Sequence, residues 1–277
     1  MRNIRLRKKA LSVAAATVLT ISGVTAPVGE KLSFFSENSV VTSLAAESSV
    51  KFLNTVGYDE AMYATWSSVN GASGYNVYVD GVKLDNMLIR QYKGYMRADA
   101  LGLKSGSHKL KVVPVINGQE DNSKSAETTA SAYANDRSGF GFVNGTSSGA
   151  YNEDGTLKSN AKVIYITNST KDTVTASFPN KDGKDTTFTG IQNIITGLKS
   201  NKKVGPVVLR FIGNIEDPAN MPKGDLYVDG VTCGLTIEGI GNDTTFNGFG
   251  LVLKGCSNVE VRNLGFMNCT GPYPRMT

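Results

Sequence analysis

Two pairs of acidic residues are the side chains whose spacing comes closest to what chemistry requires. They are Glu216–Asp217 and Asp225–Asp229, and the spacing of the second pair puts both side chains on one face of a strand that includes LYVDG. Carboxylates are the ligands of hard cations such as Ca²⁺, but a calcium site takes about six to eight oxygens. We therefore expect these acids, like the polar turn KDGKD at 181–185, to be solvated loop and rim groups rather than metal ligands.

The histidine and cysteine residues also give little indication of a catalytic or metal site. The single histidine, His108, lies in the turn-like GSHKL and is expected at the surface beside a strand. One histidine excludes a multi-histidine metal site and weakens any histidine-dependent triad. Cys233, Cys256 and Cys269 are separated by 23 and then 13 residues, which matches no zinc pattern. We expect buried thiols, and a disulfide between two of them stays open.

Composition and charge limit the class of protein. The chain has 277 residues, 40% hydrophobic and 19% charged, and contains 30 glycines against 8 prolines. These values indicate a folded, turn-rich β protein. The net charge is +5, but residues 1–46 carry +4 of it and leave +1 for the remainder. The basic balance therefore belongs to the leader, and we expect no nucleic-acid partner.

That leader has the order of a secretory signal peptide. The basic MRNIRLRKK precedes the apolar, small-residue ALSVAAATVLTISGVTAPV. We predict a signal peptide over 1–46, with cleavage near Ala45 or Ala46 rather than after Ala26. A single membrane anchor is the alternative, but alanine and threonine dilute the apolar run. We therefore expect a secreted, extracellular protein with no membrane association after cleavage.

Residues 47–133 are predicted to form an antiparallel sandwich. YATWSSV, GYNVYVDGVKL and HKLKVVPVING alternate apolar and polar residues between glycine breaks, and no helix is indicated. The only tryptophan, Trp66, lies in mid-strand. A sugar-stacking role competes with a core role for this ring, and the regular alternation favours the core. The segment 131–160 is rich in Gly, Ser, Asn and Asp and is interpreted as a loop and boundary.

The remainder, 134–277, begins with a predicted strand, AKVIYITN, and one amphipathic helix over 186–199. The helix is indicated by apolar residues at helical spacing and by Thr186 or Thr187 as N-cap. These apolar residues are Phe188, Ile191, Ile194, Ile195 and Leu198. We expect this helix to cap the repeat that follows it.

The repeat places PVVLRFIG, LTIEGIG and VEVRNLG at offsets of 28 and 24, with LYVDG and LVLKG interleaved at an offset of 25. Repeats of this length built from strands indicate a solenoid. We expect Leu209, Ile237 and Val261 to stack inside it at the strand spacing. The outward Arg210, Glu238 and Arg262 would then alternate in sign down the stack. An ordinary β-sandwich is the alternative.

Two families resemble parts of the chain. WSSVNGASGYNVYVDG with DALGLKSGSHKLKVVPV resembles a fibronectin type III domain over about residues 47–133, which implies a spacer or binding module. The run GxGxxxxxxGxGLxxKGxxNVxxRNLxF at 239–266 resembles the N-terminal half of family 1 polysaccharide lyases, the pectate lyases, and the resemblance extends over roughly 136–270. It implies a right-handed parallel β-helix. The implied fold class is thus all-β, a fibronectin type III-like sandwich followed by a truncated β-helix.

The lyase resemblance also implies a reaction. The family cleaves polygalacturonate (pectin) by β-elimination, with calcium held by carboxylates and an arginine as base. In the family those ligands and that arginine follow the RNLxF strand. Here GPYPRMT follows it, with no acid, with Pro272 and Pro274 opposing a further strand, and with Arg275 outside any matching context. No catalytic, cofactor-binding or metal residue is therefore assigned, and no calcium ligand set is expected.

The chain as given is accordingly expected to be an inactive, truncated pectate lyase-like protein whose partner is acidic plant polysaccharide. The alternative is a non-catalytic extracellular glycan-binding or surface module. Because the last strand edge would be open, we expect a monomer or an aggregation-prone protein, with aggregation or partial disorder from about residue 255 onward.

Overall fold

The structure is a computed structural model, and it describes residues 46–137, 142, 149–180, 182–269 and 275–276. The predicted signal peptide over 1–46 therefore lies outside the described residues except for Ala46. All described residues belong to one compact unit, Val41–Thr277. No helix within them is long and apolar enough to cross a membrane.

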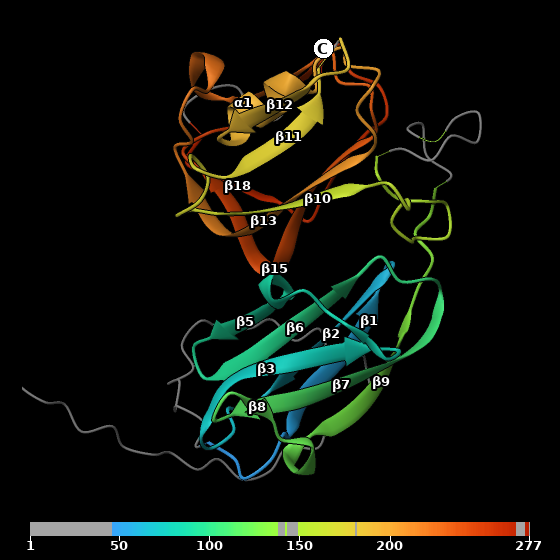
Figure 1. Ribbon diagram of the computed structural model, residues 1–277, viewed down its shortest axis with the longest axis vertical. Helices are drawn as coiled ribbons and strands as arrows, with labels where there is room; N and C mark the ends of the chain where they lie inside the picture. Colours follow the sequence, from blue (N-terminus) through green and yellow to red (C-terminus); the bar gives the residue numbers. More distant parts are fainter. Residues whose placement is uncertain (1–45, 138–141, 143–148, 181, 270–274, 277) are drawn as a thin grey trace, which may run out of the picture. The chain divides into compact units, whose positions relative to one another are not determined.

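Strands β1 to β9 form two antiparallel sheets, which we call the antiparallel half, Phe52–Ala132 (Figure 1). One sheet has the order β1 (Phe52–Tyr58), β2 (Ala61–Trp66), β6 (Tyr95–Leu101), β5 (Ile89–Tyr92). The other has the order β4 (Val82–Lys83), β3 (Ala72–Val79), β7 (Gly106–Ile116), β8 (Gln119–Glu120), with β9 (Ala126–Ala132) also on β7. Apart from two short 3₁₀ turns, no helix lies among these residues, as predicted.

A single apolar core fills the space between these two sheets. Val77 on β3 and Leu110 on β7 pack with Met62 and Trp66 on β2, and all four are fully buried. The Trp66 ring meets Tyr75 edge-on, with 5.3 Å between ring centroids. The core role predicted for Trp66 is confirmed, because a buried indole offers no face to a sugar. The strand alternation decided this, since every second residue of a strand faces the opposite sheet.

Strands β10 to β19 form what we call the parallel half, Lys162–Met276, with two parallel ladders. The first ladder has the order β10 (Lys162–Thr167), β13 (Val207–Glu216), β15 (Leu235–Asn247), β17 (Val259–Arg262), with β18 (Gly265–Met267) also on β15. The second has the order β14 (Leu226–Asp229), β16 (Leu251–Lys254), β19 (Arg275–Met276). An antiparallel hairpin, β11 (Thr175–Pro179) with β12 (Asp185–Thr189), completes it.

The register of these ladders confirms the repeat. Val207 pairs with Leu235 and Leu235 with Val259, at the offsets of 28 and 24, and Leu226 pairs with Leu251 at 25. Leu209, Ile237 and Val261 are paired in one row, as expected. Leu209 and Ile237 are fully buried, but Val261 is 37% exposed. No described strand pairs with the far side of β17, so the column is open at this end.

The predicted helix is shorter and begins later than expected. α1 spans Ile191–Gly197 and starts after Gly190, which has a φ of 82° and makes no side-chain cap. Thr186 and Thr187 lie instead in β12, because pairing with β11 gives these residues extended partners. The helix packs on the ladder core through Ile194 and its neighbours. The first rung, β10, precedes the helix, so the expectation that the helix comes before the whole stack is wrong.

The end of the chain also differs from the prediction. β17 and β18 are paired strands, so the disorder expected from about residue 255 is wrong for Val259–Arg262 and Gly265–Met267. β19 pairs with β16 at Arg275–Met276, directly after two prolines that were expected to oppose a strand. The two paired residues follow the prolines, so their own backbone amides stay free to bond.

Candidate functional site

The predicted acidic pairs are held by separate partners. Glu216 accepts from the side-chain amides of Asn214 and Asn247, at 2.7 and 3.3 Å. Asp225 is buried and accepts from the backbone amide of Gly250 at 2.8 Å, so its expected solvation is wrong. Asp229, at the end of β14, forms an exposed ion pair with Lys199. These acids satisfy local donors, and the structure does not bring the two pairs into one site.

The remaining sequence candidates are equally local. His108 lies within β7 rather than beside a strand, and its side chain is mostly covered, with Nδ1 2.6 Å from Asp80 Oδ2. Cys233, Cys256 and Cys269 are free thiols of intermediate exposure. The Sγ atoms of Cys256 and Cys269 donate to the carbonyls of Val228 and Phe249.

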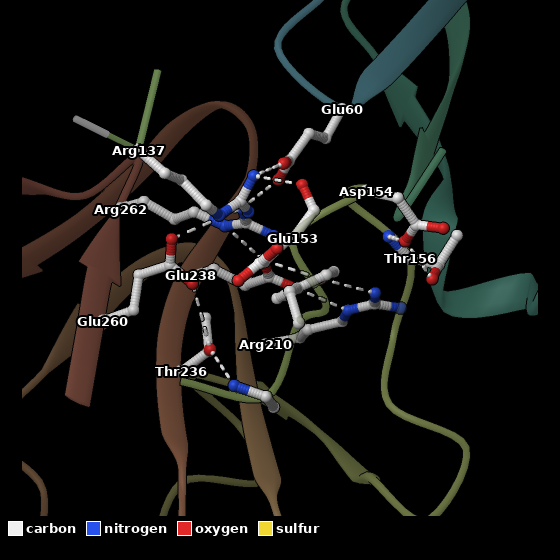
Figure 2. Close-up of polar contacts among 12 residues, drawn as sticks. Glu60, Arg137, Glu153, Asp154, Thr156, Arg210, Thr236, Glu238, Glu260 and Arg262 are labelled. Carbon is white, nitrogen blue, oxygen red and sulfur yellow. Dashed lines mark hydrogen bonds and ion pairs between the residues drawn. The ribbon is translucent and has the colours of Figure 1, made fainter. Parts of the chain in front are cut away.

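The densest group of charges is a row across three strands, which we call the charged ladder: Arg210, Glu238 and Arg262. The pairing of β13 with β15 and of β15 with β17 aligns them as the repeat predicted. Figure 2 shows both arginines directed at Glu238. Arg210 Nε donates to Glu238 Oε1 at 2.7 Å, and Arg262 Nε donates to Oε2 at 2.9 Å. Charges of alternating sign on neighbouring strands stabilise the stack.

The ladder is buried, which the sequence did not indicate. The side chains of Arg210 and Glu238 are 5% and 2% exposed, and that of Arg262 is 24% exposed. Tyr151 covers it from the segment before β10. Its hydroxyl donates to Glu238 Oε1 at 2.7 Å, and its ring lies 3.9 Å from the Arg262 guanidinium carbon. No sequence signal pointed to Tyr151, because it lies in a stretch that resembles a polar loop.

Further groups surround the Arg262 end of the ladder. Glu60, buried in the turn just before β2, accepts from Arg262 Nη1 at 3.2 Å and from Arg137 Nη1 (Figure 2). Glu260 Oε1 lies 3.8 Å from Arg262 Nη1. Each buried carboxylate in this group therefore faces a guanidinium, which offsets part of the cost of removing the charges from water.

The same contacts fix the protonation states. Burial alone would raise the pKa of Glu238, but the charges of Arg210 and Arg262 outweigh it and hold that pKa below its usual range. Burial would lower the pKa values of both arginines, yet Glu238, Tyr151 and the other acidic or hydroxyl groups around them together outweigh burial and raise those pKa values. Burial also raises the pKa of Glu260, against the opposing charges of Arg262 and Arg137.

These states decide what the cluster can do. A general base must lose its proton near the working pH. Arg210 and Arg262 are held protonated by the carboxylate between them, so neither serves as a base. Glu238 is charged and accepts from three donors, which leaves it occupied. The charged ladder is therefore a structural ion network.

Calcium, which the lyase resemblance implies, does not fit the described residues. Among them, no three His, Cys, Asp or Glu side chains gather in a way that could hold a metal ion. The carboxylates of Glu60 and Glu238 face arginines, and Asp225 faces a backbone amide. Of the candidate arginine, Arg275, the structure describes only its backbone pairing in β19.

The glycine and asparagine of the lyase-like run have a packing role. Asn263 has a φ of 53°, and its Nδ2 donates to the carbonyls of Gly239 and Gly241 at 2.7 and 2.9 Å. A Cβ on Gly239 would lie 2.0 Å from the Asn263 carbonyl oxygen. The run thus encodes the close approach of two successive turns, since only glycine leaves room there.

The comparisons with known proteins give limited likeness. No family model matches the chain, and no curated protein matches it. Among solved structures, a polysaccharide lyase matches at 14% identity with a TM-score of 0.23, covering 40% of this chain and 18% of that one. A family 28 exopolygalacturonase from Yersinia enterocolitica matches at 12% identity with a TM-score of 0.24, covering 76% and 41%. This chain thus spans less than half the length of either protein, and TM-scores this low carry no argument about fold or activity.

Proposed function

We propose that this is an exported protein of the pectate lyase class, with a fibronectin type III-like antiparallel half and a right-handed parallel β-helix as its parallel half. The observation that carries the proposal is the lyase-like run at 239–266, whose glycine and asparagine pack two successive turns of a parallel ladder. The target is acidic pectic polysaccharide, by resemblance to that class.

Under this proposal the described residues form the scaffold of the class without its chemistry. Elimination needs a cation bound by carboxylates to stabilise the developing anion, and a base to take the proton. The described carboxylates gather in no metal-binding group, and the two buried arginines are held protonated. We therefore expect no cleavage of polygalacturonate by this chain.

The test combines cleavage with binding. The protein is incubated with polygalacturonate and calcium, and the ultraviolet absorbance of the unsaturated product is followed. We expect no product, together with slower migration in a native gel containing polygalacturonate than in an empty gel. Chelator-sensitive product would refute the inactive scaffold. Unchanged migration would refute the acidic target.

A second candidate function is a non-catalytic extracellular module that binds glycan or decorates a surface. The observation favouring it is the charged ladder, in which every buried charge is paired with another charge inside the protein. Such a module would migrate equally in a native gel with polygalacturonate and in an empty gel. Slower migration with polygalacturonate that does not change when calcium is chelated would favour the pectate lyase class without a calcium site.

A further inference from the structure

A hollow on the antiparallel half has features that the proposed function does not use. It has a volume of about 530 Å³ and opens on the sheet of β3, β7 and β9. This volume lies within the usual range of small-molecule sites, about 300–1,000 Å³. From this hollow we propose that the antiparallel half binds a neutral, hydroxyl-rich oligosaccharide.

The strand register builds the hollow. Tyr78 on β3 pairs with Lys111 on β7, and Lys111 pairs with Glu127 on β9, so these three side chains form one row across the sheet. Successive residues of a strand face opposite sides, so this row lies on the face away from the buried Val77, Val79 and Val112. The row is therefore open to solvent while the other face is fixed in the core.

The lining offers both donors and acceptors side by side. Lys109 Nζ lies 3.2 Å from Glu127, and Lys111 Nζ donates to Asn122 at 3.0 Å. Tyr78 donates its hydroxyl to Glu120, which also accepts from Asn76. These contacts gather ammonium, carboxylate and amide groups on one solvent-facing surface of the sheet, where a ligand can reach them.

This chemistry suits a sugar. Sugar hydroxyl groups both donate and accept hydrogen bonds, so a surface that alternates ammonium, carboxylate and amide groups can satisfy several of them. The half-exposed Tyr78 ring presents an apolar body with a polar tip, which suits the C–H face of a pyranose ring next to its hydroxyls. An apolar ligand would leave the lining charges desolvated and unpaired.

The local charge favours a neutral ligand over an acidic one. Lys109 and Lys111, with Lys83 next to Tyr78 in the same row, balance Asp80, Glu120 and Glu127, so the hollow has no net charge when His108 is neutral. A polyuronate would gain no net attraction from this surface, whereas a neutral ligand needs none. The inference is independent of the proposed function, because it concerns another half of the chain and another ligand class.

The test is isothermal titration of the whole protein with three neutral hexasaccharides, of glucose, xylose and mannose, and with hexagalacturonate. We expect saturable binding of at least one neutral hexasaccharide that changes little with salt. Tyr78→Ala should weaken it by about tenfold, which equals about 1.4 kcal/mol, because the variant loses the aromatic ring and its hydroxyl. Tyr78→Phe keeps the ring and should retain most of the affinity.

The matched control is Tyr133→Ala, which removes a 57% exposed tyrosine outside the hollow and should leave binding unchanged. Glu127→Gln provides a second hollow variant if Tyr78→Ala alters the Trp66 fluorescence that reports folding. Absence of binding to all three neutral hexasaccharides would overturn the inference. So would hexagalacturonate binding that is lost in Tyr78→Ala. Retention of Tyr78→Ala in polygalacturonate gels would separate this site from the proposed function.

Discussion

The two halves of the molecule bury charge in different ways. The antiparallel half packs Trp66 and Val77 into an apolar core, and the outer face of the sheet that holds β6 buries one ion pair within a single strand, Arg97 with Asp99. The parallel half also has an apolar core, and its other face buries the charged ladder, which joins three strands beneath Tyr151. Both halves must pair the charges that they remove from water, but only the ladder depends on the register of neighbouring strands.

The largest effect should come from the apolar core. Trp66→Ala removes a fully buried ring, and such deletions cost about 3–5 kcal/mol because a cavity is left behind. We expect faster hydrogen exchange of amides in β2, β3 and β7, with little change in β13 and β15. Equal acceleration in both halves would show that the two cores unfold together, and the comparison would fail.

Breaking the charged ladder should act on the parallel half. Glu238→Gln leaves Arg210 without its buried counter-charge and removes one of the carboxylates that face Arg262, and removal of one member of a buried pair costs about 3–5 kcal/mol. Urea unfolding followed by far-ultraviolet circular dichroism should show an earlier transition. Trp66 fluorescence, which reports only the antiparallel half, should keep its midpoint.

The matched control for this variant is Asp229→Asn, which removes the exposed pair with Lys199 in the same half. Exposed pairs contribute about 0–1 kcal/mol. A Glu238→Gln protein as stable as the Asp229→Asn protein would contradict the structural role of the ladder.

A smaller effect is expected where two turns touch. Gly239→Ala would place a methyl group against the Asn263 carbonyl oxygen, and overpacking of this kind costs about 1–3 kcal/mol. Gly74→Ala is the control, because a Cβ there would meet nothing within 4 Å. Thermal unfolding of the two variants gives the comparison, and a Gly239→Ala protein with an unchanged midpoint would rule out the close approach.

The smallest effect concerns pH in the antiparallel half. Burial would lower the pKa of His108, but Asp80 and the Lys104 carbonyl outweigh it and raise that pKa. A raised pKa means that the contact stabilises the fold fully below about pH 6.5, the usual value, and that the contribution is lost as pH rises through the folded value. The Asp80 pKa is lowered, chiefly by the His108 hydrogen bond, so its contribution is lost only at acidic pH.

The midpoint of the Trp66 fluorescence transition should therefore fall slightly as the pH rises above about 6.5. His108→Asn should remove this slope. A slope that is unchanged in His108→Asn would assign the pH dependence to another group.

The sequence predicted those features that depend on period alone. Alternation gave the two antiparallel sheets and the core role of Trp66, and the offsets gave the pairing of Leu209 with Ile237 and of Arg210 with Glu238. The prediction from sequence failed where pairing with another strand determines the local conformation. Thr186 and Thr187 became strand residues because β11 pairs with them, although their local context favours a helix start.

The amino-acid sequence by itself determined which residues pair across each ladder, because the repeat length fixes the register between neighbouring strands. Only the tertiary structure determined which of those rows of side chains are buried. Tyr151, 59 positions before Arg210, covers the charged ladder, and this burial turns a row expected at the surface into an internal network with fixed protonation. The energy of a charge depends on its surroundings in three dimensions, which no spacing along the chain records.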